Sequence, residues 1–160
     1  MSVCRLAGWP CLAVAVFVLA ACGVPRDPEN SLERIRQTGV IRAGISAREP
    51  FTTAAGGPEA EVITAFAQSL GARVEWHHAS ESTLFEALEK FELDVAVGGF
   101  TDDNPWGPKL GLTRPYLEIG NKKHVMAVAP GENRLLLEIE RVLRAHAPAV
   151  AARVGGKPMS

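Results

Sequence analysis

The sequence predicts an α/β fold with three layers, in which helices cover both faces of a mostly parallel sheet. Between Ser31 and Val97, short apolar runs alternate with segments of helical periodicity, and the connections between them are short. This order is typical of parallel strands joined by crossover helices. A polar loop that carries an indole follows the last apolar run, and such loops are where open α/β sheets hold ligands.

Composition fits one ordinary globular domain. The 160 residues are 47% hydrophobic and carry a net charge of −1, without the basic runs that nucleic-acid binding needs. Cys4, Cys11 and Cys22 all lie within the first 22 residues. The rest of the chain therefore offers neither a disulfide framework nor a cysteine metal site. We expect no nucleic-acid partner, no metal and no cofactor.

The N-terminus has the pattern of an export signal. Arg5 precedes an apolar run over 11–21, which suits a signal-peptide core and is short for a membrane span. The run ends in Leu-Ala-Ala-Cys, which resembles the bacterial lipoprotein box. This resemblance implies a signal peptide over 1–21, acylation of Cys22, and a lipid anchor in the periplasm or cell envelope. An ordinary secretory signal with a chance cysteine, or an uncleaved anchor, are the alternatives.

The first elements follow a proline-containing tether over 22–30. Asn30 and Glu33 have the spacing of a capping box, which predicts a short helix over Ser31–Gln37. The apolar run Val40–Ile45 then predicts the first strand.

The second helix is predicted to begin at Pro58, a residue suited to the first helical position. Glu59 and Glu61 lie in its first turn, where carboxylates favour the positive end of the helix dipole. Its apolar face extends to Leu70, and the second strand is expected over Arg73–His77.

Two adjacent histidines, His77 and His78, invite a metal interpretation. Successive side chains of a strand point to opposite faces, so the pair does not predict a zinc site. Ser80 or Ser82 is expected to cap a third helix that continues to Lys90.

The third strand is predicted over Leu93–Val97, and it enters Gly98 and Gly99, where the backbone approaches another group closely. The loop Thr101–Pro108 contains two carboxylates, an indole, two prolines and a glycine. A short extended segment, Leu112–Tyr116, follows it.

This stretch resembles the first lobe of the bacterial extracellular solute-binding proteins of family 3, the periplasmic amino-acid-binding type. That family reads D-x-x-x-G-G-(aromatic or Met)-T and, about a dozen residues later, Ser/Thr-x-P-Y. The residues here that match are Asp94, Gly98, Gly99, Phe100, Thr101, Thr113, Pro115 and Tyr116. The family's ligand-binding arginine usually follows the threonine by five positions, where this sequence has Trp106 without any gap.

A second departure is the missing second lobe. The chain passes from Tyr116 through a hairpin at Asn121 directly to an apolar run at 124–129. The resemblance implies that this run is an antiparallel return strand, followed by a C-terminal helix from Asn133. Pro148 is expected to weaken the continuation of this helix, with Ala149–Val154 as an optional last turn. The expected fold is thus lobe 1 of the type II periplasmic-binding-protein fold. Its predicted organisation is signal peptide 1–21, tether 22–30, lobe 31–154 and flexible tail 155–160.

The resemblance also implies a ligand site at the open face of the lobe. Its predicted members are Phe51, Gly99, Phe100, Thr101 and Trp106. Phe51 either lines the ligand or anchors its loop on the sheet. Trp106 either stacks on a ligand, or holds a cation over its ring, or packs against Pro105 and Pro108. Glu61 is expected to be a helix-terminal charge rather than a ligand contact.

The leading hypothesis is a non-enzymatic, lipid-anchored solute-binding protein associated with transport. Its ligand would be amino-acid-like, or another small polar or cationic solute, and a membrane transporter or other membrane protein would be its partner. A protein-interaction or sensor module with a vestigial site is the alternative. A dehydratase-type enzyme using Asp102, Asp103 or Glu49 is disfavoured, because no second catalytic group accompanies them and a single lobe leaves the site open to water.

Overall fold

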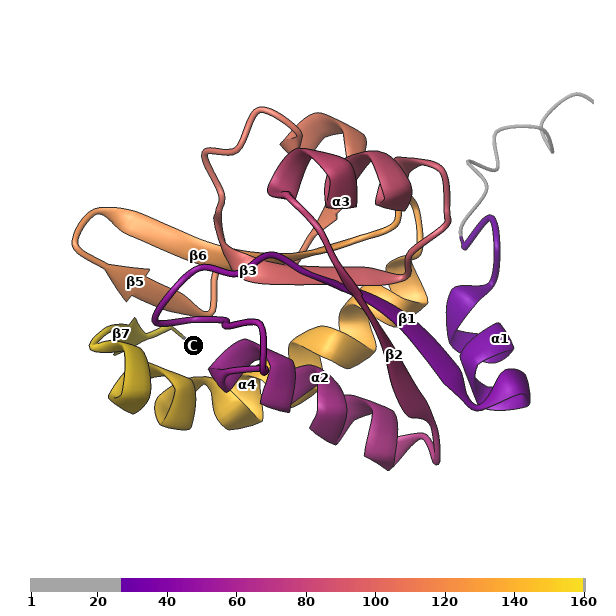
Figure 1. The fold of residues 1–160 in the computed structure, drawn as a ribbon, viewed down its shortest axis with the longest axis horizontal. Helices are drawn as coiled ribbons and strands as arrows, with labels where there is room; N and C mark the ends of the chain where they lie inside the picture. Colours follow the sequence, from indigo (N-terminus) through magenta and orange to yellow (C-terminus); the bar gives the residue numbers. More distant parts are fainter. Residues whose placement is uncertain (1–26, 160) are drawn as a thin grey trace, which may run out of the picture.

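The structure is a computed structural model that describes residues 27–159, so the predicted signal peptide and Cys22 lie outside the described residues. Four α-helices, a short 3₁₀ helix and seven strands make up this part of the chain (Figure 1). The bounds are α1 Ser31–Thr38, β1 Val40–Ile45, α2 Pro58–Ser69, β2 Arg73–His78, α3 Glu81–Glu89, β3 Val95–Thr101, η1 Gly107–Lys109, β4 Gly111–Leu112, β5 Leu117–Ile119, β6 Lys122–Val128, α4 Asn133–Val154 and β7 Lys157–Pro158.

The sheet is open and mixed, with strand order β2-β1-β3-β6-β5-β7 and β4 paired to β6. The pairs β1–β2 and β1–β3 are parallel, and every pairing of β6 and β5 is antiparallel. The predicted α/β lobe and its antiparallel return strand are confirmed. The parallel part is limited to the three N-terminal strands, because the return through β6 turns the rest of the sheet antiparallel.

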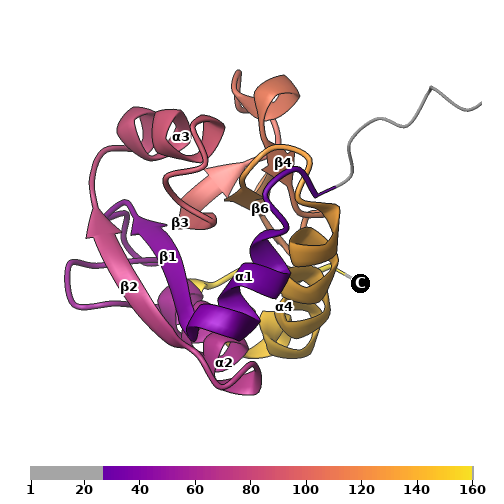
Figure 2. The same ribbon diagram turned by 90° about the vertical axis from the view of Figure 1, so that its right-hand side faces the viewer.

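Helices cover both faces of the sheet. Helices α1, α2 and α4 lie on one face, and α3 with η1 lies on the other (Figures 1 and 2). Side chains of β3 point to both faces of the sheet. Val95 and Val97 belong to the core under α1, α2 and α4, called the first core, and Ala96 and Phe100 belong to the second core, under α3. Within residues 27–159, none of the helices has the length and apolar character to cross a bilayer.

Helix α1 is capped by Glu132, which precedes α4, and not by the predicted capping box. Asn30 is left-handed, with φ of 47°, and its side chain caps nothing. The carboxylate of Glu132 instead accepts the backbone N–H groups of Glu29 (2.7 Å) and Ser31 (2.8 Å). In return, the Asp27 carboxylate accepts the N–H of Arg134 (2.7 Å). We call this exchange the reciprocal cap. The cap predicted at α3 is confirmed for Ser80.

Helix α4 continues through Pro148 and ends at Val154, so the optional last turn over Ala149–Val154 is present. Ala147, Val150 and Ala151 are buried on the first core, and this packing compensates for the hydrogen bond that a proline removes. The predicted tail contains the short strand β7, which pairs with β5, and the N–H of Met159 donates to the carbonyl of Tyr116.

The beginning of β3 is fixed by a buried carboxylate. Asp94 is fully buried and accepts hydrogen bonds from Arg34 Nη2 (2.5 Å), Arg42 Nη2 (2.7 Å) and the Arg42 N–H (2.8 Å). Two guanidinium groups therefore compensate its charge and tie α1, β1 and β3 together at the end of the sheet where β3 begins.

Candidate functional site

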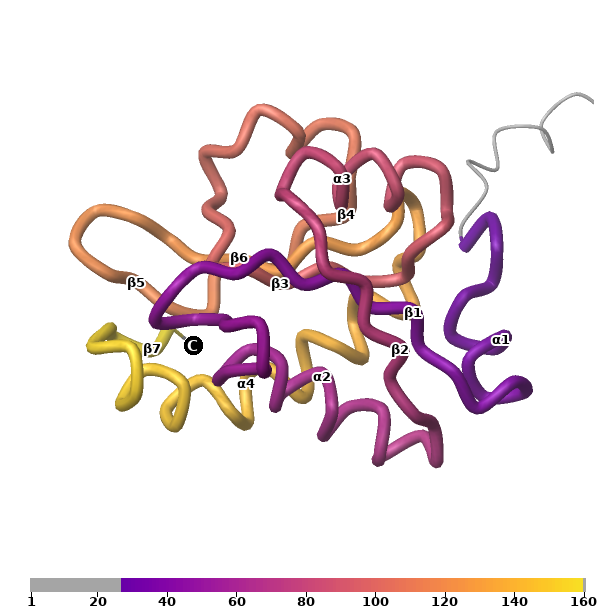
Figure 3. The backbone as a smooth tube through the Cα atoms, viewed as in Figure 1, coloured from indigo at the N-terminus to yellow at the C-terminus, as the bar shows by residue number. Residues whose placement is uncertain are grey.

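The carboxyl ends of β1 and β3 lie side by side, because the two strands pair in parallel up to Ile45 and Val97. The N–H of Ser46 extends the contact by donating to the carbonyl of Val97 (3.0 Å). Residues 46–57 then loop back toward the start of α2, while β3 continues through Gly98 and Gly99 (Figure 3). This is the end of the sheet where the sequence predicted a site.

Gly99 occupies a position that strongly favours glycine. Its φ is +63°, and a Cβ built there would lie 2.5 Å from the Phe51 ring. Phe51 is 5% exposed, and its ring lies against His124 with 4.4 Å between the ring centroids. Gly98 and Gly99 lie within β3, where its register with β6 shifts, and we call this irregular part of the strand the Gly98–Gly99 turn. It lies directly on an aromatic pair contributed by the 46–57 loop and β6.

A buried carboxylate holds this turn from the side of α2. Glu59 is fully buried, and its Oε2 accepts the N–H groups of Gly98 (2.8 Å) and Gly99 (2.9 Å). The hydroxyl of Tyr116 donates to its Oε1. Burial raises the pKa of the Glu59 carboxyl, and the three donors oppose that rise. Burial also raises the pKa of Tyr116, so its hydroxyl stays protonated as the donor.

His124 holds the same turn from the side of β6. Its Nδ1 lies 3.2 Å from the carbonyl oxygen of Gly99, in hydrogen-bond range for the tautomer that carries the proton there. Burial lowers the pKa of His124, which favours the neutral imidazole. Gly99 is thus fixed through its N–H by Glu59 and through its carbonyl by His124.

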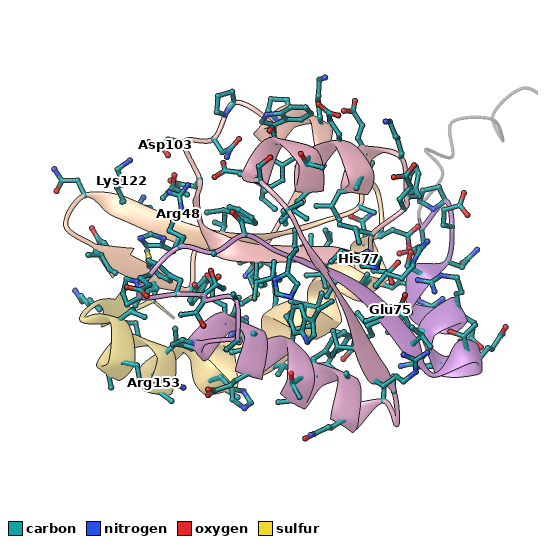
Figure 4. The ribbon with its side chains drawn as sticks, viewed as in Figure 1. Arg48, Glu75, His77, Asp103, Lys122 and Arg153 are labelled. Atoms are coloured by element: carbon teal, nitrogen blue, oxygen red, sulfur yellow. The ribbon has the colours of Figure 1, made fainter. Side chains whose placement is uncertain are left out.

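Charged side chains surround the outer side of the turn. The carboxylate of Glu81, at the start of α3, accepts hydrogen bonds from Arg48 Nη2 (2.9 Å) and Asn104 Nδ2 (2.5 Å). Glu81 thereby joins the loop after β1 to the loop after β3. Lys122 and Asp103 lie at the same end of the molecule (Figure 4). The Thr101 hydroxyl and the charge of Lys122 lower the pKa of Asp103.

Solved structures with this architecture are binding proteins. Domain 1 of TmArgBP in its arginine-bound form matches with a TM-score of 0.61 and 24% identity, over 70% of this chain and 97% of that domain. The ancestral cationic amino acid solute binding protein AncCDT-1 matches with a TM-score of 0.64 and 14% identity, over 78% of this chain and 99% of that one. The chain has the fold of a single solute-binding-protein lobe.

Curated proteins similar in sequence to this solute-binding-protein lobe are named for another activity. A membrane-bound lytic murein transglycosylase F 1 from Alkalilimnicola ehrlichii is 34% identical over 126 residues, 74% of this chain and 26% of that protein. The transglycosylase F of Vibrio cholerae is 31% identical over 96 residues, 56% and 18% of the two chains. The lobe thus spans about a quarter or less of these relatives. No family model matches the sequence.

The five predicted site residues occupy different environments in the lobe. Phe51 and Gly99 meet at the turn, and Thr101 follows at its outer end with its hydroxyl donating to Asp103 (2.5 Å). Phe100 is 2% exposed and packs edge-on against Phe85, 4.7 Å between centroids, so its side chain belongs to the second core.

Trp106 is half-buried beside that second core. Its ring lies 6.0 Å from the Phe85 ring, and Lys109 Nζ lies 5.0 Å from its centroid. The indole already carries a cation of its own chain over its face. The position of the family's arginine is therefore occupied by a packing residue on the α3 side of the site.

Sequence reasoning did not identify Glu59, His124 and Arg48 as members of this end of the lobe. For Glu59 a signal was available, because residues 59, 62, 63 and 66 have the spacing of one helical face, and the other three are apolar. Glu61 lies outside that face, and is exposed and paired with Arg153 (2.5 Å), as expected for a helix-terminal charge. His124 and Arg48 carry no comparable signal in the sequence.

The side chains considered for the enzyme and metal alternatives lie exposed on the surface. Asp102, Asp103 and Glu49 are all exposed. His77 faces solvent on β2, 3.9 Å from Glu75 (Figure 4). In the part of the chain that the structure describes, no three His, Cys, Asp or Glu side chains are grouped to hold a metal ion.

Proposed function

We propose that this lobe is a non-enzymatic binding module for a small polar solute, held at the carboxyl ends of β1 and β3. The observation that carries the proposal is the Gly98–Gly99 turn, fixed by Glu59 and His124 beside the 46–57 loop. A turn fixed on both sides presents its remaining backbone groups in one geometry, which is the preorganisation that ligand binding rewards. Of the predicted site residues, Phe51 and Gly99 meet at this turn and Thr101 follows it, while Phe100 and Trp106 pack in the second core behind it.

One lobe can be sufficient for such binding. The isolated domain 1 of TmArgBP, which 70% of this chain matches, was crystallised in an arginine-bound form. That precedent supports a site that needs no second lobe to cover it, although water then reaches one side of the ligand.

The charged side chains around the Gly98–Gly99 turn favour an amino-acid-like ligand that is bound differently from the family pattern. Position 106 has no arginine, and Arg48 and Lys122 are two cations at this end (Figure 4). A ligand carboxylate can replace Glu81 at Arg48, and Glu81 with Asp103 can then accept from a ligand amine. A small zwitterion offers both the carboxylate for Arg48 and the amine for Glu81 and Asp103, whereas a cationic solute offers only the amine.

The cellular setting belongs to the same proposal. The Leu-Ala-Ala-Cys motif supports acylation of Cys22, hence a lipid-anchored protein of the periplasm or cell envelope that serves transport beside a membrane transporter. Incorporation of radiolabelled palmitate into the wild-type chain, but not into Cys22→Ser, tests this part alone.

The curated relatives favour a second candidate function. Their names connect this kind of lobe to murein-cleaving proteins, so the chain can also serve as a sensor or interaction module beside such an enzyme. The ligand would then be a murein-derived peptide or amino sugar rather than a free nutrient.

A thermal-shift screen of residues 22–160 carrying Cys22→Ser distinguishes these candidates. The ligands are free amino acids, amines, small organic acids and soluble murein fragments. A dose-dependent rise in melting temperature with one class identifies the ligand. Arg48→Gln should abolish the response to a carboxylate ligand, whereas Arg36→Gln, on α1, is the matched control and should not.

Trp106→Arg, tested alongside, asks whether the family's carboxylate clamp can be restored. A response to amino acids by this variant alone would mean that the native site is vestigial. The protein-interaction alternative would then replace the binding proposal.

A further inference from the structure

Helix α4 has a basic stripe on its exposed face. Arg134, Leu137, Arg141 and Arg144 follow at spacings of three, four and three residues, so they share one side of the helix. All four are exposed. Leu137 is 58% exposed, and it is the one large hydrophobic side chain so exposed among residues 27–159. We call these four residues the α4 stripe.

Carboxylates near the stripe neutralise only part of its charge. Arg141 pairs with Glu138 at 2.8 Å. Glu140 is mostly covered and accepts the N–H of Arg114, whose own side chain is 79% exposed. Within the described residues, Arg134 and Arg144 form no ion pair. A hollow of about 260 Å³ lies between Arg114 and the stripe, lined by Arg114, Leu137, Glu140, Arg141 and Arg144.

The stripe begins where the N-terminal segment is fixed to the lobe. The Asp27 carboxylate accepts the N–H of Arg134, and Figure 2 places the start of the described chain beside the start of α4. Only four residues, 23–26, separate Asp27 from Cys22. At about 3.5 Å per residue, an extended chain covers at most roughly 18 Å from Cys22 to Asp27. Arg144 lies about 15 Å along the helix from Arg134, at 1.5 Å per residue.

We infer that the α4 stripe docks on an anionic membrane surface. The inference builds on the proposed lipid anchor, which would hold this end of the lobe within reach of the lipid headgroups. Three arginines would meet lipid phosphates, and Leu137 would enter the headgroup region beside them. The stripe begins near the end of the sheet where β3 starts, and the carboxyl ends of β1 and β3 lie at the opposite end (Figure 1), so docking leaves the candidate ligand site free.

Vesicle co-sedimentation tests the stripe without the anchor. Residues 22–160 carrying Cys22→Ser, which contain the whole described fold, are mixed with vesicles of phosphatidylcholine alone or with added phosphatidylglycerol. We expect partition only onto the vesicles that contain phosphatidylglycerol, and loss of that partition in high salt. Replacing Arg134, Arg141 and Arg144 by glutamine should weaken partition roughly 100-fold, since each contributes about a factor of five.

A matched variant controls for net charge. Arg73→Gln, Lys90→Gln and Lys123→Gln remove the same charge from exposed positions on other elements and should leave partition unchanged. Leu137→Ser should weaken partition while preserving its salt dependence. Equal losses in the two triple variants, equal partition onto both vesicles, or no partition at all would overturn the inference and leave an acidic protein as the partner to seek. Because Cys22 is absent here, failure of the stripe is distinguishable from failure of acylation, which palmitate labelling measures separately.

Discussion

Two buried carboxylates lie at opposite ends of β3, and their partners differ in kind. Asp94, before the strand, accepts from two arginines and one backbone N–H. Glu59, under the Gly98–Gly99 turn near the other end, accepts only from neutral donors, two backbone N–H groups and a tyrosine hydroxyl. Both side chains are fully buried.

The difference separates an end built for stability from an end built to hold a backbone in place. Opposite charges offset the cost of burying Asp94, so that end gains a rigid connection among α1, β1 and β3. Glu59 forms no ion pair, the charge of Arg48 acts on it only as the smallest of the opposing effects, and burial raises its pKa. A poorly compensated charge beneath a ligand-type loop is a feature of functional sites more often than of plain cores.

Asp94→Ala should be the most destabilising change, lowering the free energy of unfolding by about 3–5 kcal/mol, because two largely covered guanidinium groups lose their partner. Asp94→Asn should cost less, since it keeps the shape and an acceptor for the Arg42 N–H. Urea unfolding followed by circular dichroism measures both. A loss below about 1 kcal/mol in the alanine variant would show that water replaces the carboxylate at no cost.

Glu59→Ala should cost about 2–4 kcal/mol by leaving three buried donors without an acceptor. It should also abolish any ligand-induced thermal shift, because the Gly98–Gly99 turn is no longer fixed. Glu59→Gln keeps an acceptor for the two glycines and should retain most of the stability. If Asp94→Asn, at comparable stability, removed ligand binding as completely, the proposed division between the two ends would be wrong.

Tyr116→Phe isolates one of the three donors to Glu59. It should lower the free energy of unfolding by about 1–2 kcal/mol and raise the pKa of Glu59 further, since a donor to the charged form is lost. Infrared spectroscopy of the buried carboxyl group measures the second effect. If the carboxyl band of Tyr116→Phe titrated as in the wild-type protein, a direct Tyr116–Glu59 hydrogen bond would be excluded.

The pH dependence of stability should have opposite signs for His124 and Glu59. Burial lowers the folded pKa of His124, so its contribution is complete above about pH 6.5 and is lost as the pH falls, when the unfolded chain takes up the proton first. The raised pKa of Glu59 gives a contribution that is complete below about pH 4.5 and is lost as the pH rises.

Unfolding free energies between about pH 5 and pH 7.5 measure both slopes, each limited to about 1.4 kcal/mol per pH unit. His124→Asn should remove the His124 component, and Glu59→Gln should remove the component of opposite sign. A wild-type curve unchanged by either substitution would show that neither group titrates differently in the folded and unfolded chains.

Local sequence signals were sufficient for most of the fold. The run over 40–45 and Pro58 at the start of α2 are where they were expected, because hydrophobic period and proline geometry act over a few residues. The start of α4 at Asn133 agrees with the position that the family resemblance implied. The capping box at Asn30 failed, because the acceptor that satisfies α1 comes from Glu132.

The residues of the candidate site were harder to predict from the sequence than the fold. Its general location followed from Gly98 and Gly99, which lie within β3, but the choice between Glu59 and Glu61 depends on which face of α2 meets the sheet. Two acidic residues in a first turn look equivalent until the apolar positions of the whole helix are aligned with them. His124 depends on the register of β3 with β6, which pairs Thr101 with His124.

The reciprocal cap also bears on when the chain can fold. Its hydrogen bonds join residues separated by 101 to 107 positions, so the eight-residue helix α1 lacks its capping carboxylate until Glu132 has been synthesised. A helix of that length is marginal alone, and closing so long a loop is entropically costly. We therefore expect α1 to form late on the nascent chain, only after Glu132 has left the ribosome, so that the N-terminal segment joins the lobe after its central strands have been synthesised.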